Sequence, residues 1–259
     1  MRAAWYEKQG PASEVLQLGD LPTPEPGPGE VRVKLSFSGV NPSDTKRRLG
    51  FGGQKMAYPA IVPHSDGSGI IDQVGTGVSK NRIGERVWIY CGQWERAHGT
   101  AADYISIRGN HAIPLPDNIE LMSGACLGIP AVTAHRALFS DGPIKGLTVL
   151  VTGGAGAVGN YAIQLAKWGG AERVITTCSS LGKENQAKAA GADLVINYKE
   201  EDVSAKIMDA TDGQGVDRIV EVAFGANLPS TVALLKDNGI ISAYASDIEP
   251  TPILPFYPM

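Results

Sequence analysis

Segments typical of strands alternate with segments typical of helices from Leu147 to Ala245. The strand-like segments are rich in β-branched residues, and apolar residues recur at helical spacing between them. We expect strands over residues 149–153, 174–178, 194–198, 218–223 and 240–245, and helices over residues 160–167, 183–190, 203–210 and 228–235. Strands joined by helical crossovers form a parallel sheet that is covered by helices on both faces. This part of the chain therefore predicts a doubly wound α/β domain.

Short strands and turns dominate the N-terminal half of the chain. Apolar residues alternate with polar ones at Val31, Val33, Leu35 and Phe37, which is the pattern of a strand with one buried face. Further strand-like segments cover residues 69–71, 86–90 and 102–107, and turns rich in Pro and Gly separate them. Residues 123–139 are expected to form a helix that joins the two halves. We therefore predict an irregular β-barrel domain over residues 1–122 and the α/β domain over residues 123–259.

A glycine loop follows the first predicted strand of the α/β domain. Gly154, Gly156 and Gly159 fit the pattern G-x-G-x-x-G, and an amphipathic helix follows them. In a dinucleotide site, Gly154 would form the tight turn, Gly156 would let a pyrophosphate approach the backbone, and Gly159 would pack against the strand. The helix would begin near Ala157 and Val158, and its N-terminal N–H groups would face the phosphates. The alternative is a glycine loop that only packs a helix.

The end of the second predicted strand indicates which dinucleotide is bound. An NAD site places Asp or Glu about 20 residues after the glycine motif, where the carboxylate binds the ribose 2′-hydroxyl. Here the chain has Thr177-Cys178-Ser179-Ser180, without an acid. The hydroxyls of Ser179 and Ser180, with the ammonium of Lys183, would suit a 2′-phosphate, so the sequence predicts NADP. Alternatively, Ser179 caps the next helix and Lys183 is a solvated surface charge.

Composition and charge exclude several other classes of protein. The 259 residues carry 23 basic and 27 acidic side chains, a formal net charge of −4, which indicates neither nucleic acid nor an anionic membrane as a partner. No run approaches the length of about 18 apolar residues that a spanning helix needs, and we expect a soluble, cytoplasmic protein. Cys91, Cys126 and Cys178 are scattered and odd in number, and the four histidines show no paired spacing. We therefore expect neither a disulfide framework nor a bound metal.

Six stretches of the chain match, in the same order, one branch of a known superfamily: SGVNPSDTKRRLG, PHSDGSGIIDQVG, GIPAVTAHRAL, VLVTGGAGAVG, AGADLVINYKEED and GVDRIVEV. Together they resemble the zinc-free quinone oxidoreductases, of the ζ-crystallin type, within the medium-chain dehydrogenase/reductase superfamily. The resemblance implies a GroES-like irregular β-barrel and a Rossmann-type domain that binds NADPH. It further implies hydride transfer to a small-molecule quinone or α,β-unsaturated carbonyl compound (an enone), and a homodimer.

The resemblance bears directly on zinc. Zinc-dependent members of the superfamily place a cysteine at the position of Asn41 and a histidine at the position of Ser65, so both ligands are replaced here. His64 is the neighbouring residue, but one imidazole without a thiolate does not make a catalytic zinc site. The four-cysteine lobe that holds structural zinc in those enzymes is also missing. The resemblance therefore implies an enzyme without zinc.

The resemblance also assigns site residues. It places Asn41 beside the nicotinamide ribose and the substrate, as the catalytic residue, and Thr133 near the nicotinamide. It places Ser179, Lys183 and Tyr198 around the adenosine 2′-phosphate, which agrees with the lack of an acid at that strand end. By position alone, the ends of the fourth and fifth strands would pass along the cofactor at Ala223, Ala243, Tyr244 and Ala245. The alternative for Asn41 is a turn asparagine that caps its neighbours.

Two departures from the family pattern concern the substrate. Quinone oxidoreductases usually carry a tyrosine where this chain has Lys46, and the loop YCGQWERAHGT, which contains Trp94, replaces a shorter connection. We therefore take Lys46 and Trp94 as candidate substrate contacts. The basic run Lys46-Arg47-Arg48 would attract an anionic substrate such as a CoA thioester, or alternatively form a solvated helix face. The basic run favours one alternative function, an enoyl reductase acting on CoA or carrier-bound thioesters. The resemblance to a lens crystallin implies a second alternative, a protein that binds NADPH without turnover.

Family members continue after the fifth strand with a sixth strand and a segment that returns to the barrel. Here the residues after Asp247 form a proline-rich tail, IEPTPILPFYPM. On this comparison we expect the returning segment to be absent from the chain.

Overall fold

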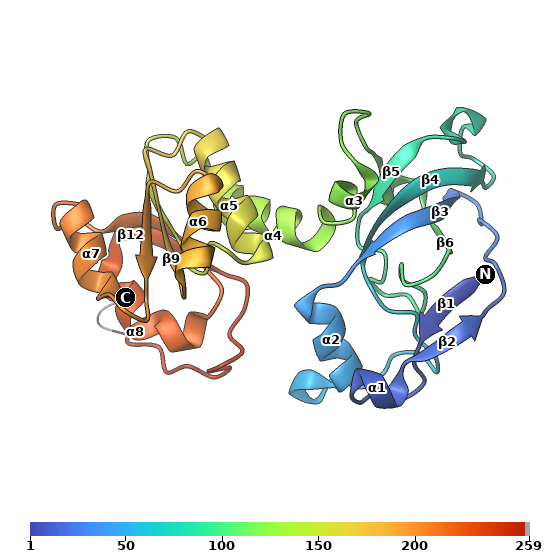
Figure 1. Cartoon of the computed structure of the whole chain (residues 1–259), viewed down its shortest axis with the longest axis horizontal. Coiled ribbons are helices and arrows are strands. Elements are labelled where there is room, and N and C mark those ends of the chain that lie inside the picture. Colours follow the sequence, from blue (N-terminus) through green and yellow to red (C-terminus); the bar gives the residue numbers. More distant parts are fainter. Residues whose placement is uncertain (257–259) are drawn as a thin grey trace. The chain divides into compact units, whose positions relative to one another are not determined.

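A computed structural model describes residues 1–256, and the last residues of the proline-rich tail, 257–259, lie outside this description. The chain divides into two compact units, Met1–Ile129 and Pro130–Met259. The division falls after Ile129, a few residues beyond the boundary expected from the sequence. Figure 1 shows an antiparallel sheet in the first unit and a parallel sheet in the second.

An antiparallel sheet forms the centre of the first unit. Its strands are β3 (Glu30–Gly39), β4 (Asp66–Val74), β5 (Arg86–Ile89), β6 (Tyr104–Arg108) and β7 (Ala112–Pro114), in the order β6-β3-β4-β5-β7. Alternate side chains of these strands are buried together, among them Val31, Val33, Ile71, Val87 and Ile105. The sheet curls into the GroES-like half-barrel that the sequence predicted.

One residue of the predicted alternation is an exception. Phe37 is 44% exposed, although the pattern placed it on the buried face with Val31 and Val33. The pairing of β3 with β4 shifts register between Leu35 and Phe37. Such an irregularity changes which face a side chain occupies, so the alternation stops at Leu35.

Besides three 3₁₀ helices, Phe51–Gly53, Lys80–Arg82 and Gly109–His111, two strands and three short α-helices complete the first unit (Figure 1). They are β1 (Arg2–Trp5), which pairs with β2 (Gln17–Asp20), and α1 (Ala12–Val15), α2 (Pro42–Leu49) and α3 (Leu121–Gly124). Pro42 is the first residue of α2, where the missing N–H costs nothing and the fixed φ suits a helix. Gly50 ends α2 in a left-handed conformation with a φ of 72°. These residues fix where α2 begins and ends.

The five strands of the second unit are parallel. They are β8 (Thr148–Val151), β9 (Arg173–Cys178), β10 (Leu194–Asn197), β11 (Val216–Glu221) and β12 (Leu235–Ala243), in the order β10-β9-β8-β11-β12. The chain runs outward from β8 to β10 and then continues at β11, on the other side of β8. Strand order therefore reverses between β8 and β11, and ligands of such sheets bind at this point, beyond the carboxyl ends of the strands.

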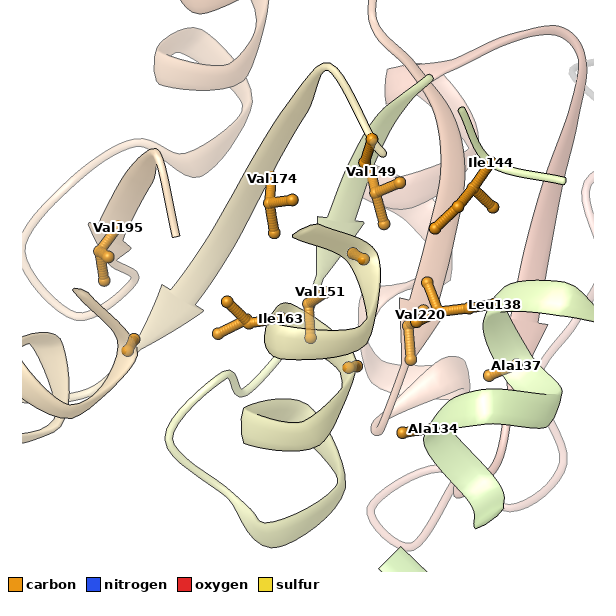
Figure 2. Packing of buried hydrophobic residues seen from close by; sticks show 14 of the residues in the cluster. Ala134, Ala137, Leu138, Ile144, Val149, Val151, Ile163, Val174, Val195 and Val220 are labelled. Atoms are coloured by element: carbon orange, nitrogen blue, oxygen red, sulfur yellow. The ribbon is translucent and has the colours of Figure 1, made fainter. Parts of the chain in front are cut away.

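Helices cover both faces of the parallel sheet. Along β8, Val149 and Val151 belong to one hydrophobic cluster and Leu150 to the other, because alternate residues of a strand point to opposite faces. The first cluster includes residues of α4 (Gly128–Phe139), α5 (Ala157–Trp168) and α6 (Leu181–Ala189), and Figure 2 shows part of it. The second includes residues of α7 (Val203–Ala210) and α8 (Phe224–Leu234). The doubly wound, Rossmann-type sheet predicted from the sequence is confirmed.

The prediction of a single helix over residues 123–139 is wrong. The structure has α3, which ends at Gly124, and α4, which begins at Gly128. Pro130 explains the break, because in a continuous helix it would lack the hydrogen bond to residue 126 and its ring would clash with that carbonyl. In the first turn of α4 its missing N–H costs nothing, since N–H groups there have no partner within the helix.

Candidate functional sites

The glycine loop joins β8 to α5 at the carboxyl edge of the parallel sheet. Gly153 has a left-handed backbone with a φ of 68°, so Gly153 makes the turn that we had assigned to Gly154. Gly153 N donates to Thr177 Oγ1 and Gly154 N donates to Thr177 O, both at 3.1 Å. The end of β9 therefore holds the loop in place.

Crowding explains two of the three glycines of the motif. A methyl group at Gly154 would lie 2.1 Å from Thr176 Oγ1, and one at Gly159 would lie 2.4 Å from Gly153 O. Both positions therefore require the absence of a side chain for close packing. At Gly156 the nearest heavy atom, Gly153 O, would be 3.2 Å away, so this position is less closed.

The start of α5 provides donors for an anion. Gly156 is the N-cap residue, and Ala157 and Val158 begin the helix. N–H groups in the first turn have no acceptor within a helix and lie at the positive end of its dipole. A glycine loop followed by N–H groups that have no acceptor within the helix fits the pyrophosphate of a dinucleotide.

Ser179 and Lys183 are paired beyond the end of β9. Lys183 Nζ donates to Ser179 Oγ at 3.0 Å. Ser180 is the N-cap residue of α6, so the alternative in which Ser179 caps this helix is wrong. Tyr198 N donates to Cys178 O at 3.1 Å, which places Tyr198, 53% exposed, close to Ser179. An ammonium and a hydroxyl are therefore paired at this strand end, and the main chain of Tyr198 lies beside them; ammonium, hydroxyl and phenol groups can all donate hydrogen bonds to a phosphate.

A buried carboxylate at the reversal of strand order was missed by the sequence analysis. Glu221, the last residue of β11, is fully buried, and its Oε1 accepts from Thr152 Oγ1 at 2.8 Å and from Ala223 N at 2.6 Å. Asn227 Nδ2 donates to the same oxygen at 2.9 Å. Among residues 1–256, Glu221 Oε2 has no hydrogen-bond partner. Glu221 thereby ties the residue after β8 to the start of α8. The sequence could have indicated this residue, because Glu221 is an acid at the end of an otherwise apolar stretch of strand.

The residues predicted at the end of β12 contact this same edge. β12 ends at Ala243, Tyr244 N donates to Glu221 O at 3.0 Å, and Phe224 N donates to Ala245 O at 3.0 Å. Burial raises the pKa of Tyr244, and the nearby charge of Glu221 adds to the increase. The structure thus brings Tyr244 and Ala245 together with Glu221 and the start of α8.

Thr133 is the predicted nicotinamide contact on α4. Its side chain is half-buried, and the next residue, Ala134, packs into the hydrophobic cluster of Figure 2. Thr133 is therefore held on a helix that covers the same face of the sheet as α5.

Asn41 lies in the first unit, at the start of α2, and only 7% of it is exposed. Asn41 Nδ2 donates to Asp66 Oδ2 at 2.8 Å, and Asn41 N donates to Asp44 Oδ2 at 2.8 Å. Asp66 Oδ1 also accepts from Ile129 N at 2.9 Å. Two buried carboxylates therefore fix the main chain and the side chain of Asn41. Asn41 is also the N-cap residue of α2, as the alternative reading of this residue expected.

Both carboxylates around Asn41 lie where burial favours the protonated form. Burial raises the pKa of Asp44 to about 6, against the lowering effect of the hydrogen bond from Asn41. The charge of Asp66 raises it further, and that of Arg47 lowers it. Burial also raises the pKa of Asp66, while hydrogen bonds from Asn41 and Ile129 lower it.

The donor set at the positions of the zinc ligands does not fit zinc. Ser65 is buried and offers a hydroxyl, and Asn41 offers an amide. His64 has a left-handed backbone with a φ of 78°, and its Nδ1 lies 2.9 Å from Ser38 Oγ. In the part of the chain that the structure describes, no group of three or more His, Cys, Asp or Glu side chains could hold a metal ion.

Trp94 and Lys46, the two candidate substrate contacts, have different surroundings. Trp94 is 62% exposed and lines a cavity of about 440 Å³ in the first unit, together with Arg47. Lys46 is not part of this lining, and its ammonium lies 5.7 Å from the centroid of the Phe51 ring. The structure therefore supports a shared pocket for Trp94 and Arg47 rather than for Trp94 and Lys46.

The basic run on α2 is not a solvated helix face. Arg47 Nη1 donates to Gln93 Oε1 at 2.5 Å, and Arg48 Nη1 donates to Gly10 O at 2.5 Å. Both arginines are only partly exposed. The solvated alternative is therefore wrong for Arg47 and Arg48.

Known families and relatives match both units. The pattern of the alcohol dehydrogenase GroES-like domain matches residues 27–117, and that of zinc-binding dehydrogenases matches residues 157–259. A quinone oxidoreductase of Rattus norvegicus is 37% identical over 236 residues, which are 90% of this chain and 69% of the relative. A trans-enoyl reductase of Aspergillus terreus is 32% identical over 216 residues, 78% of this chain and 70% of the relative.

Solved structures share the whole fold. The Escherichia coli quinone oxidoreductase complexed with NADPH has a TM-score of 0.84 at 26% identity, covering 99% of this chain and 76% of that one. An NAD-dependent alcohol dehydrogenase has a TM-score of 0.84 at 33% identity, covering 96% of this chain and 80% of that one.

The chain belongs to the zinc-free quinone oxidoreductase branch of the medium-chain dehydrogenase/reductase superfamily, as its motifs predicted. It is therefore an oxidoreductase that uses a nicotinamide cofactor. Within residues 1–256, no helix has the length and apolar character that a bilayer span requires.

Proposed function

We propose that the protein is an NADPH-dependent reductase that transfers a hydride to quinones or to α,β-unsaturated carbonyl compounds. The observation that carries the proposal is the pair of Lys183 and Ser179 beyond β9, where the sequence has no acid. An ammonium and hydroxyls bind a 2′-phosphate, whereas the ribose of NAD would lack its usual carboxylate partner. The similarity to quinone oxidoreductases supports the choice of acceptor.

The second unit would hold the cofactor along the carboxyl edge of its sheet. The N–H groups at the start of α5, near Ala157 and Val158, would bind the pyrophosphate. The adenosine 2′-phosphate would contact Ser179, Ser180, Lys183 and Tyr198, and the nicotinamide half would pass along Thr133, Ala223, Ala243, Tyr244 and Ala245. When bound, NADPH supplies the hydride from C4 of its nicotinamide.

Asn41 would orient the acceptor in the first unit. Its Nδ2 carries two hydrogens, and Asp66 accepts one of them, so the other can donate to a carbonyl oxygen of the acceptor. A fixed donor of this kind stabilises the negative charge that develops on that oxygen during reduction. A conjugated acceptor spreads the charge, so a neutral donor suffices and solvent can deliver the proton. A simple alcohol would need a group that ionises it, and Asn41 and Ser65 do not supply one.

Turnover assays test this proposal. We expect NADPH to be oxidised by a quinone and by an enone, and we expect simple alcohols not to reduce NADP. Asn41→Ala should lower kcat more than it weakens NADPH binding, because Asn41 acts on the acceptor. Asn81→Ala, which changes an exposed asparagine of the same unit, is the control and should leave both unchanged. Efficient oxidation of simple alcohols without reduction of quinones or enones would contradict the proposal, and tight NADPH binding without any turnover would indicate a binding protein.

Enoyl thioesters are the second candidate substrates, because a trans-enoyl reductase is among the relatives. This candidate differs from the first in the group that carries the conjugated double bond. A comparison of kcat/KM for crotonyl-CoA and for a quinone decides between them. A higher value for the thioester would replace our proposal with the enoyl reductase.

A further inference from the structure

The cavity beside α2 has no role in the function proposed so far. Its volume is about 440 Å³, which lies in the range of small-molecule sites. Its walls come from α2, from residues 54–58 and from residues 93–96, all in the first unit. The loop at 93–96 is part of the stretch that distinguishes this chain from the family pattern.

Positive charge dominates the cavity. Arg47, Lys55 and Arg96 line it, against one carboxylate, Glu95. In the described part of the chain, none of these three cations forms an ion pair with a carboxylate. This local excess differs from the chain as a whole, whose formal net charge is −4. The cavity therefore attracts anions.

The polar partners of the two arginines are neutral. Arg47 Nη1 donates to Gln93 Oε1 at 2.5 Å, and Arg96 Nη2 donates to Ser106 O. A neutral oxygen fixes the position of a guanidinium without cancelling its charge, and a guanidinium has five N–H donors. Arg47 is therefore held in place with donors left for an anionic group.

Apolar and aromatic side chains form the rest of the wall. Tyr6, Met56, Tyr58 and Ile61 belong to one hydrophobic cluster, and Trp94 adds a largely exposed indole. Aromatic and apolar side chains of this kind favour binding of a ligand with a flat ring, which can stack against them.

Two hydrogen bonds hold the loops of the cavity. Tyr58 Oη donates to Glu95 O at 2.6 Å, and Gln9 Nε2 donates to Gln54 O at 2.7 Å. The cavity is thus built in advance from two loops, so that less ordering is needed when a ligand binds.

Helix α2 connects the cavity to the residue that we propose as catalytic, because Arg47 lines the cavity and Asn41 caps the same helix. Arg47 lies six residues after Asn41, about 9 Å along the axis of α2. The charge of Arg47 acts on Asp44, and Asp44 holds the main chain of Asn41. The separation of about 9 Å along the helix axis is comparable to the length of a two-ring acceptor.

We propose that this cavity binds an acidic substituent of the acceptor, so that the preferred substrates are flat quinones or enones that carry an ionised group. Arg47 is then a specificity-determining residue, and Trp94 and Tyr58 contact the ring. This inference rests on the proposed reductase function for its consequence in turnover, but ligand binding can be measured without turnover.

A matched pair of quinones tests the inference on the full chain. 2-Hydroxy-1,4-naphthoquinone ionises at neutral pH, whereas its 2-methoxy analogue cannot. We expect Arg47→Gln to weaken binding of the hydroxyquinone about tenfold or more, as loss of a charge-assisted contact does, and to change binding of the methoxy analogue less than about twofold. Arg47→Lys should keep most of the affinity because it keeps the charge. Lys80→Gln removes an exposed cation elsewhere in the same unit and should change neither.

Calorimetry measures the binding of each quinone, and the affinities are then compared with the rates of NADPH oxidation by the same quinones. Added salt should weaken binding of the hydroxyquinone more than binding of its analogue. Equal loss for both quinones in Arg47→Gln, or no loss for either, would overturn the inference. Charge-dependent binding without oxidation of NADPH by either quinone would support the anion site and contradict the reductase function.

Discussion

Each unit has a buried carboxylate in its candidate site, but the two carboxylates hold different groups. Glu221 accepts from Thr152 Oγ1 and from Ala223 N, and so fixes the chain at two ends of parallel strands. Asp66 accepts from the side-chain amide of Asn41. Glu221 thus holds two side chains and one backbone N–H where parallel strands end, whereas Asp66 holds Ile129 N and the one side chain that we propose as the acceptor contact, Asn41. A substitution in the second unit should therefore affect stability and cofactor binding, and one in the first should affect catalysis and pH dependence.

Glu221→Ala is expected to have the largest effect. It leaves Thr152, Ala223 N and Asn227 without their buried acceptor, and each such loss costs about 1–3 kcal/mol. We expect the free energy of unfolding to fall by roughly 3–5 kcal/mol and NADPH binding to weaken with it. Glu221→Gln keeps one acceptor oxygen and should lose less.

Urea denaturation measures this effect. Glu172→Ala, which removes an exposed glutamate of the same unit, is the control and should stay close to wild type. If Glu221→Ala is no less stable than this control, Glu221 does not hold the cofactor edge together.

The ionisation of the carboxylates around Asn41 should instead make the free energy of unfolding depend on pH. The pKa of Asp44 is about 6 in the folded chain against 3.8 as its ordinary value, so between these pH values the folded state holds a proton that the unfolded state has lost. The free energy of unfolding therefore falls as pH rises from about 4 to about 6, by up to about 3 kcal/mol, and above about pH 6 this loss remains but no longer changes with pH. Asp44→Asn should remove this part of the slope.

Denaturation over this pH range compares the wild type, Asp44→Asn and Asp20→Asn. Asp20 is exposed on β2, so its replacement should keep the wild-type slope. The raised pKa of Asp66 has the same sign, so a smaller slope should persist in Asp44→Asn. A slope that is the same in all three proteins would show that Asp44 is not held in its protonated form.

The same contrast explains what the sequence could predict. Local periodicity and the glycine motif predicted the strands and helices of the second unit, and α7 begins and ends where expected, at Val203 and Ala210. Pro130 indicated a break between α3 and α4. The prediction of one continuous helix gave more weight to the apolar pattern, which runs on through both helices. Gly153 directly precedes Gly154, the first glycine of the motif, and only the structure shows which of the two turns the chain.

The parts that sequence reasoning missed depend on residues far apart in the chain. Thr152 and Glu221 are 69 residues apart, and only the parallel pairing of β8 with β11 brings them together. The cavity likewise needs Arg47 and Gln93, which are 46 residues apart. The sequence pointed to Trp94 as part of an unusual loop, but the partner it suggested was Lys46, because the run of three basic residues does not reveal which side chain faces the loop.

The affinities of Lys183→Ala for NADPH and NADH test the central claim, that the cofactor is NADPH, most directly. Loss of a charge-assisted contact of roughly 1.5–3 kcal/mol should raise the dissociation constant for NADPH by about tenfold to a hundredfold, while that for NADH stays unchanged. Lys188→Ala, on the same helix but paired with Glu184, is the control and should bind both cofactors like the wild type. Equal affinity of the wild type for NADPH and NADH, or unchanged NADPH binding in Lys183→Ala, would contradict the account.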